Sequence, residues 1–385
     1  MTPSQRAGDF LQAYQIEVSD DTLSEAVDRI RSTRWSAITE GDTPRYGASV
    51  TELRSVLRYW AEDYDWRLWE RKLNAHPQFT APIDGVDGHF WHIRSQSANG
   101  IPLLLVHGWP GAVVEFWDLI EPLSAPESAG APDAPAFDVV IVELPGFGFS
   151  GKPREPGWGL SRIADFLHSL MHDVLGYQKY VIHGTDWGSL IAGRTAQRHP
   201  DHVEAIQIAM PYAQAPEGTE PDAAWESRQF EINGFDHVQS NVPDALTVGM
   251  ADSPLALAAW VLEKYRSWSD CDGDLLSIFD IDQLVTILNF YWLESAIISS
   301  TRLYREVALE NEPMTASSGV SVPTGIIDFP KEPFASPRDW VERAYNVQRW
   351  TSFPSGGHFG GLEQPKAVLS EIREFFPKHY GATSD

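Results

Sequence analysis

The spacing of apolar residues predicts that the chain begins with helices. Within residues 20–35, apolar positions recur at helical spacing behind a capping Ser19 or Asp20, and a second helical stretch is predicted over residues 50–73. Neither helix brings a sheet of its own. Residues 1–80 are therefore interpreted as a lead-in that packs on the main domain.

From residue 78, short β-branched and aliphatic runs replace the helical spacing. Residues 78–93 predict a hairpin, and residues 124–136, rich in Ala, Pro and Ser, predict a surface loop. Strand and helix signals then alternate, which implies parallel strands joined by right-handed crossovers. The predicted strands are 101–106, 139–143, 180–183 and 205–209, and the predicted helices are 116–123, 163–175 and 190–198.

The alternation stops after Met210-Pro211. Residues 212–318 predict helices and loops, and this insertion before the last strands indicates a cap over the carboxyl edge of the sheet. The predicted fold class is α/β, a mostly parallel sheet flanked by helices, with its core divided between residues 81–211 and 319–385. The remaining predicted elements are cap helices over 255–268 and 284–309, strands at 320–322 and 348–353, and a final helix at 365–376.

Composition and charge narrow the classes of function. With 385 residues, of which 43% are hydrophobic, the chain is long enough for one large core with an insertion. The formal net charge of −25 argues against nucleic acid and anionic membranes as partners, because both would repel the chain. No signal peptide and no apolar run of membrane-spanning length is visible, so the expected compartment is the cytoplasm. The oligomeric state is open, with a homo-oligomer as one option.

The single cysteine, Cys271, rules out an intrachain disulfide and a cysteine-based metal cluster. No cofactor and no metal ion is predicted. Fifteen tryptophans indicate a bulky, apolar pocket, although most of them are expected to serve packing.

The strongest chemical signal lies at residues 180–189. An apolar β-branched run meets the turn Gly184-Thr185-Asp186-Trp187-Gly188, and helical spacing follows. This is the pattern of a nucleophile elbow, with aspartate in the place of serine. Asp186 is an anion at neutral pH and can attack a saturated carbon directly, giving an alkyl-enzyme ester that an activated water hydrolyses. Such chemistry suits epoxides and alkyl halides, whereas the alternative interpretation is a loop with a solvated aspartate.

A second turn with chemical potential is His107-Gly108-Trp109-Pro110-Gly111, after the strand at residues 101–106. It is expected to aim the backbone N–H of Trp109 at the site, with a cis bond before Pro110. Together with the N–H of Trp187, this group would form an oxyanion hole.

The general base and its acid partner are expected after the last strands. His358, in a glycine-flanked loop, has the right chain order for the base, whereas His183 and His107 are assigned structural roles. The acid that orients the histidine ring should follow the strand at 320–322, where Glu332 and Asp328 compete. Spacing alone does not choose between them.

With these residues in place, the sequence resembles the microsomal-type epoxide hydrolases of the α/β-hydrolase superfamily over nearly its full length. It lacks the membrane anchor of that family and so resembles the soluble bacterial members. The matching stretches, in family order, are TRW (33–35), YDWR (64–67), LNAHPQFT (73–80), HGWPG (107–111), VEFW (114–117), ELPGFGFS (143–150), GTDWGS (184–189), DSPLALAAWVLEKY (252–265), ISSTRLY (298–304), VPTG (322–325), FPKE (329–332) and GGHF (356–359).

The resemblance implies the α/β-hydrolase fold, an amino-terminal domain that wraps the core, and the set of nucleophile Asp186, base His358 and acid Glu332. It also implies two tyrosines in the cap that donate hydrogen bonds to the epoxide oxygen. Tyr304 matches one of them.

At the position of the second tyrosine, after Gly234, this chain has Phe235, which carries no donor. Either Tyr304 acts alone, or Tyr212, His237 or a water replaces the missing hydroxyl. Residues 235 and 212, together with Phe359, are expected to line the substrate pocket.

The predicted function is hydrolysis of an epoxide to a vicinal diol, with the epoxide and water as the small-molecule partners. The aromatic content favours a bulky aromatic or polycyclic epoxide, in detoxification or secondary metabolism. One alternative is a haloalkane dehalogenase, in which Trp187 would help to bind the leaving halide. The other is a non-catalytic binding protein on the same scaffold.

Overall fold

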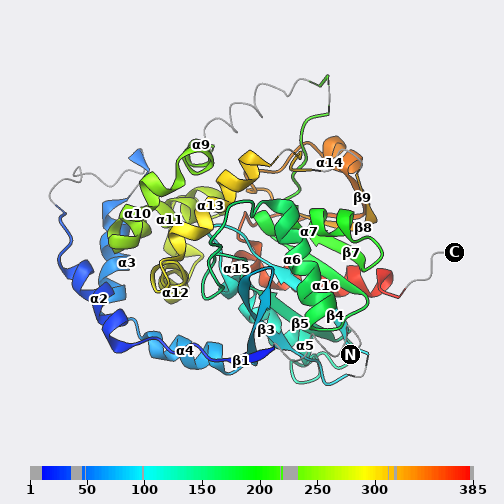
Figure 1. The fold of residues 1–385 in the computed structure, drawn as a ribbon, viewed down its shortest axis with the longest axis horizontal. Helices are drawn as coiled ribbons and strands as arrows, with labels where there is room; N and C mark the ends of the chain where they lie inside the picture. The colour runs from blue at the N-terminus through cyan, green and yellow to red at the C-terminus, as the bar shows by residue number, and fades with distance from the viewer. Residues whose placement is uncertain are drawn as a thin grey trace.

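A mostly parallel sheet carries the candidate site, and its strands come from both ends of the chain (Figure 1). The computed structural model describes residues 11–35, 46–47, 49–97, 99–216, 218–219, 233–310, 312–315 and 319–381, and within them nine strands join in the order β1-β2-β3-β5-β4-β6-β7-β8-β9. The strands from β4 to β9 pair in parallel, whereas β1, β2 and β3 form an antiparallel edge joined to β5. The strands are β1 (Gln12–Tyr14), β2 (Gln78–Ile83), β3 (Val86–Ile93), β4 (Ile101–Val106), β5 (Phe137–Val142), β6 (Tyr180–Gly184), β7 (Val203–Ile208), β8 (Val320–Asp328) and β9 (Tyr345–Ser352).

The central strands are buried along their whole length, as expected where helices cover both faces of a parallel sheet. Every residue of β4 and β6 is buried, and Leu103, Leu104 and Leu105 are fully enclosed. The predicted α/β architecture is therefore confirmed.

The predicted hairpin also forms, with Gln78 paired to Trp91. Its turn places Asp84 and Gly85 at φ angles of 50° and 80°, the left-handed conformation that a two-residue hairpin turn requires. Because β2 begins at residue 78 and β1 pairs with it, the lead-in extends the sheet as well as packing on it. Helical spacing did not reveal the three-residue strand β1.

The lead-in helices are shorter than predicted, and the second stretch is divided. The side chain of Ser19 caps α2 by accepting from the backbone N–H of Thr22, so the cap is Ser19 and not Asp20. Asp65 caps a new helix by accepting from the N–H of Arg67, which breaks the predicted helix over residues 50–73. α2 and α3 pack on the cap helix α11, so the lead-in contacts the cap as well as the core. The three helices are α2 (Asp20–Arg31), α3 (Val50–Glu62) and α4 (Trp66–Asn74).

The core helices follow the predicted alternation with local changes of type. The segment predicted as a helix over 116–123 is a 3-10 helix followed by one α-helical turn, and α6 ends in a π-helical turn. α6 and α7 pack against each other, and α7 lies on β6, β7 and β8. These elements are η3 (Val113–Leu119), α5 (Ile120–Ser124), α6 (Leu160–Ser169), η4 (Leu170–Val174), α7 (Trp187–Arg198), α14 (Arg338–Ala344), α15 (Gly360–Glu363) and α16 (Pro365–His379).

Helices form the described part of the predicted cap, on one side of the sheet (Figure 1). Residues 220–232 of the predicted cap lie outside the described residues. The helix predicted over 284–309 is divided at Ser295, whose φ of 51° is left-handed and ends the helical path. The cap elements are α9 (Gly234–Asn241), α10 (Pro243–Asp252), α11 (Pro254–Trp268), η5 (Leu275–Ser277), α12 (Ile281–Trp292) and α13 (Ala296–Leu309).

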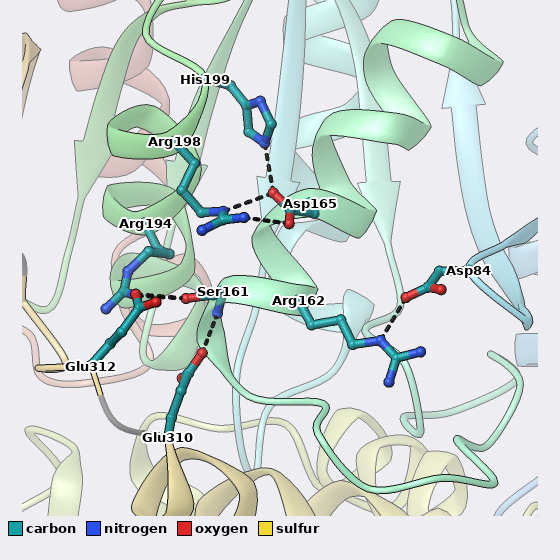
Figure 2. Close-up of polar contacts among 9 residues, drawn as sticks. All are labelled: Asp84, Ser161, Arg162, Asp165, Arg194, Arg198, His199, Glu310 and Glu312. Carbon is teal, nitrogen blue, oxygen red and sulfur yellow. Dashed lines mark hydrogen bonds and ion pairs between the residues drawn. The ribbon is translucent and has the colours of Figure 1, made fainter.

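Polar contacts tie the end of α13 to the core (Figure 2). The carboxylate of Glu310 accepts from the backbone N–H groups of Leu160 and Ser161, at the amino end of α6. Glu312 pairs with Arg194 of α7. The cap helix is thus anchored on two core helices. In the described part of the chain, no helix combines the length and the apolar character needed to cross a membrane.

Candidate active site

The elbow predicted at Asp186 forms where β6 meets α7. Asp186 has φ 48° and ψ −128°, a strained conformation for a residue with a side chain. A Cβ atom on Gly184 would lie 2.2 Å from the carbonyl oxygen of Gly188, and one on Gly188 would lie 2.0 Å from that of Val106. Both flanking positions therefore require glycine, and the expected steric reason is confirmed.

A histidine and a second carboxyl group lie beside Asp186, and all three residues follow the carboxyl ends of strands. His358 follows β9, and its Nε2 lies 3.2 Å from Asp186 Oδ2, without the alignment of a hydrogen bond. Its Nδ1 lies 2.9 Å from Oε2 of Glu332, which follows β8. The other oxygen of Glu332 accepts from the N–H of Phe334 at 3.0 Å. One imidazole thus stands between two carboxylates.

Asp328, the competitor of Glu332, is engaged elsewhere. Its Oδ2 accepts from Trp350 Nε1 at 3.1 Å and from Ser352 Oγ at 2.7 Å. Of the two candidates that spacing left open, the structure brings Glu332 to His358.

The two carboxylates control the charge of the buried imidazole. Burial by itself disfavours the cation, but the negative charge of Glu332 and the nearness of Asp186 raise the pKa of His358 well above its ordinary value. With Asp186 ionised, the surroundings of His358 therefore favour its cation.

The turn at residues 107–111 lies against the carboxylate of Asp186. The N–H of Trp109 donates to Asp186 Oδ1 at 2.6 Å, and the bond between Trp109 and Pro110 is cis, as expected. A Cβ atom on Gly108 would lie 1.9 Å from the same oxygen and 2.5 Å from the backbone nitrogen of Trp187. Glycine here leaves room for the carboxylate beside both amides that were predicted to form an oxyanion hole.

Tyr304 of α13 approaches this site from the cap. Its ring packs edge-on against Trp187, with centroids 4.8 Å apart, and against Trp109 at 5.8 Å. Burial, followed by the charge of Asp186, raises the pKa of Tyr304 well above its ordinary value, so the hydroxyl stays protonated. Phe235 of α9 stacks on Trp109 at 5.8 Å and contributes only carbon atoms.

A cavity of about 350 Å³ lies between the elbow and the cap. Of the three residues expected in the substrate pocket, Phe235 and Tyr212 line this cavity and Phe359 does not. The ring of Phe359 stacks on Tyr265 at 3.8 Å, so its place in the pocket is corrected to a supporting one beside His358. The lining side chains include Asp186, Trp187, Tyr212, Phe235, Asp236 and Tyr304.

Sequence reasoning missed Asp236, Met314 and Phe334, which also line the cavity. Asp236 adjoins Phe235 and Phe334 adjoins the Glu332 loop, so closeness in sequence to predicted residues was the available signal. The described part of the chain contains no group of three or more His, Cys, Asp or Glu side chains arranged to hold a metal ion.

Comparisons with known proteins agree with this geometry. A family model described as "Epoxide hydrolase N terminus" matches residues 11–116, and one described as "alpha/beta hydrolase fold" matches residues 101–236. The pig protein epoxide hydrolase 1 is 30% identical over 413 residues, covering 97% of this chain and 90% of the relative. The chain belongs to the epoxide hydrolase family.

Solved structures of epoxide hydrolases have the same fold over nearly the whole chain. The juvenile hormone epoxide hydrolase of the silkworm Bombyx mori superposes with a TM-score of 0.85 at 30% identity, covering 97% of both chains. The Aspergillus niger epoxide hydrolase superposes with a TM-score of 0.84 at 25% identity, covering 98% of both. The resemblance seen in the sequence motifs is thereby confirmed.

Proposed function

We propose that this epoxide hydrolase converts an epoxide to a vicinal diol through a covalent ester on Asp186. One observation carries the proposal: the carboxylate lies at the cavity, between the N–H of Trp109 and the imidazole of His358, with Tyr304 also lining the cavity. A nucleophile, a base and a donor are thereby available to one small ligand.

In the first step, an oxygen of Asp186 attacks an epoxide carbon, and the carbon–oxygen bond of the ring breaks. The electron pair goes to the ring oxygen, which accepts a hydrogen bond and then a proton from Tyr304. Since the pKa of Tyr304 is raised, its hydroxyl is fully protonated when the substrate enters. Positioned acids of this kind contribute about 10²- to 10⁴-fold to a rate.

In the second step, water hydrolyses the ester. Ester formation removes the charge of Asp186, which is one of the influences that raise the pKa of His358. The imidazole then gives up its proton, which returns through water to the phenolate of Tyr304, and becomes a base for the attacking water. The imidazole takes one proton of a water whose oxygen bonds to the ester carbonyl carbon, and the amides of Trp109 and Trp187 stabilise the oxyanion. Collapse breaks the bond to the substrate oxygen, which takes the second proton of the water, so that the diol is released and the carboxylate is restored.

The two alternatives have less support. A dehalogenase would use the same carboxylate, but the protonated hydroxyl of Tyr304 suits an epoxide oxygen that gains a proton. A binding protein would not need a histidine held between Asp186 and Glu332. The relatives named above are epoxide hydrolases, in agreement with the first reading.

We also propose an epoxide with a bulky apolar body as the substrate. The aromatic side chains of Trp187, Phe235 and Phe334 line the cavity and favour a substrate of this kind, and Asp236 adds a polar group to the same cavity. The cytoplasmic location and a homo-oligomer stay predictions.

The test is a single turnover in heavy-oxygen water with an aryl epoxide, followed by mass spectrometry of the peptide containing Asp186. We expect one heavy oxygen in the carboxyl group, and none in His358→Gln, in which the unhydrolysed ester accumulates. Asp186→Ala should form no diol. Unlabelled Asp186 after diol formation, or halide release from bromoalkanes without epoxide turnover, would contradict the proposal.

A further inference from the structure

Glu115 is a buried carboxyl group that the mechanism above does not use. It lies in η3, its residue is 4% exposed, and it touches the loops that carry the nucleophile, the oxyanion amide and the base. Its Oε2 accepts from Oγ1 of Thr185, the residue before Asp186, at 3.2 Å. This contact connects the carboxyl group directly to the elbow.

The other two loops are packed onto Glu115 without spare room. A Cβ atom on Gly361, which follows the His358 loop, would lie 2.7 Å from Glu115 Cγ. A Cβ atom on Gly111, which ends the turn that carries Trp109, would lie 3.3 Å from Glu115 Oε2. The elbow and the turn that ends at Gly111 therefore meet the carboxyl group of Glu115, and the start of α15, which follows the His358 loop, meets its backbone and Cγ.

The second oxygen of this group, Oε1, is buried and finds no hydrogen-bond partner among the residues that the structure describes. An ionised carboxylate in such a place is costly. Burial raises the pKa of Glu115 to about 8, and the charge of Asp186 acts in the same direction, whereas the charge of His358, the hydrogen bond from Thr185 and the backbone N–H of Gly361 act in the opposite direction. At neutral pH the group is therefore mainly uncharged.

Other ionisable groups also lie around Glu115, each with a partner of its own. Glu363 on α15 binds the backbone N–H groups of Asp270 and Phe359, and burial raises its pKa to about 7. On α16, Arg373 donates to the carbonyl of Pro122. The cap contributes two buried tyrosines, whose hydroxyls donate to the turn that ends at Gly111 and whose pKa values burial raises well above the ordinary one: Tyr265 and Tyr291.

We propose that Glu115 is a positioning residue that supports the Asp186 loop as a neutral acid, and that a negative charge on it slows hydrolysis of the alkyl-enzyme ester. This inference rests on the proposed function. His358 can act as a base only after ester formation has removed the charge of Asp186. A charge on Glu115 would partly replace the lost one, keep the imidazole protonated and oppose the oxyanion.

The ring-opening step should depend less on this charge, because negative charge then moves away from Asp186 toward the epoxide oxygen. Comparing the rates of ring opening and ester hydrolysis therefore distinguishes the proposed role from a merely structural one. A structural role would lower both rates at every pH.

The experiment measures hydrolysis of the preformed alkyl-enzyme by rapid quench across pH. In the wild type we expect the rate of ester hydrolysis to fall by about tenfold when the pH is high enough to ionise Glu115, whose pKa burial raises above its usual value. In Glu115→Gln, which cannot ionise, the ratio of alkaline to neutral rates should change by less than about twofold. The same alkaline fall in Glu115→Gln would overturn the proposal.

Glu363→Gln is the matched control, since it removes a second buried carboxyl group beside the His358 loop. In this variant the rate of ester hydrolysis should still fall at alkaline pH. If Glu363→Gln loses that fall and Glu115→Gln keeps it, the effect belongs to Glu363 and the proposal is overturned. Infrared difference spectra should show a protonated carboxylic acid at neutral pH that Glu115→Gln lacks.

Thr185→Val provides a second test that does not depend on the folding of Glu115→Gln. It removes the hydrogen bond that lowers the pKa of Glu115, so the alkaline fall in the rate of ester hydrolysis should lie at higher pH than in the wild type. An alkaline fall at the same pH as in the wild type would overturn the proposal. If the wild type forms no ester, the proposed function fails, whereas an ester hydrolysed at a rate independent of pH refutes only the role of Glu115.

Discussion

Two histidines at opposite ends of β6 show how neighbours decide the charge of one side chain. His358, near the carboxyl end, stands between two carboxylates, and its pKa is raised. His168 bonds to the hydroxyl of Tyr180, the first residue of β6, and its ring stacks on His199 with centroids 3.8 Å apart and 7° between the planes. Burial and then the neighbouring imidazoles lower the pKa of His168 to about 4.

The difference lies in what surrounds each ring rather than in burial, which opposes the cation at both places. Carboxylates are also present near His168, but they pair with the outer members of its cluster. Asp165 binds His199 and Arg198 (Figure 2), and Asp173 lies by His172. Of these two histidines, only the one whose own ring is in contact with carboxylates has a raised pKa.

The largest expected effect follows from removing the poised histidine. His358→Gln should form the alkyl-enzyme but hydrolyse it on the order of 10²- to 10⁴-fold more slowly, because no base remains for water. Rapid quench with mass spectrometry would detect the accumulated ester. The matched change His168→Gln should leave turnover within about twofold, and equal losses in the two variants would break the comparison.

Neutralising the acid partner should have a smaller effect. In Glu332→Gln, ester hydrolysis should slow by about 10²-fold, because His358 is then a weaker base and removes a proton from water more slowly. Because the charge of Glu332 raises the pKa of His358, its loss should move the midpoint of the pH profile for hydrolysis to lower pH. A midpoint that moves upward would contradict the assigned direction.

The second histidine should be visible in stability toward acid. Because the pKa of His168 is lowered to about 4 in the folded chain, His168 binds a proton in the unfolded chain at a higher pH than in the folded chain. The free energy of unfolding therefore falls as the pH drops from about 6.5 toward 4. His168→Gln removes this contribution, and its melting temperature should fall on the order of 2 °C less than that of the wild type over this range. Scanning calorimetry at several pH values checks this, with His237→Gln of the exposed α9 surface as the control.

The smallest effect is expected at the rejected acid. Asp328→Asn keeps an oxygen for Trp350 and Ser352 and touches neither His358 nor the cavity, so turnover should stay within about twofold. A loss comparable to that of Glu332→Gln would mean that Asp328 orients the histidine.

Much of the site was predictable because its signals are local. The glycines around Asp186 are demanded by clashes within a few residues and with one adjacent strand, and the alternation of strand and helix follows from short-range periodicity. The hairpin at Asp84-Gly85 is likewise encoded in its own turn.

The remaining features depend on contacts between distant segments. Asp328 is the last residue of β8 and Glu332 lies in the loop after it, and only the packing of the loop after β9 brings Glu332 to His358. Phe359 adjoins the base in sequence, yet its ring turns to Tyr265 and away from the cavity.

The sequence by itself determined the class of fold, the elbow, the cis turn and the reaction type, because backbone sterics and residue chemistry act over short stretches. The tertiary structure alone decided which acid meets the histidine, and that Glu115 lies buried beneath three loops. Those outcomes depend on charges and side chains brought together by the sheet. The pKa of a buried group is set by neighbours that the order of residues does not reveal.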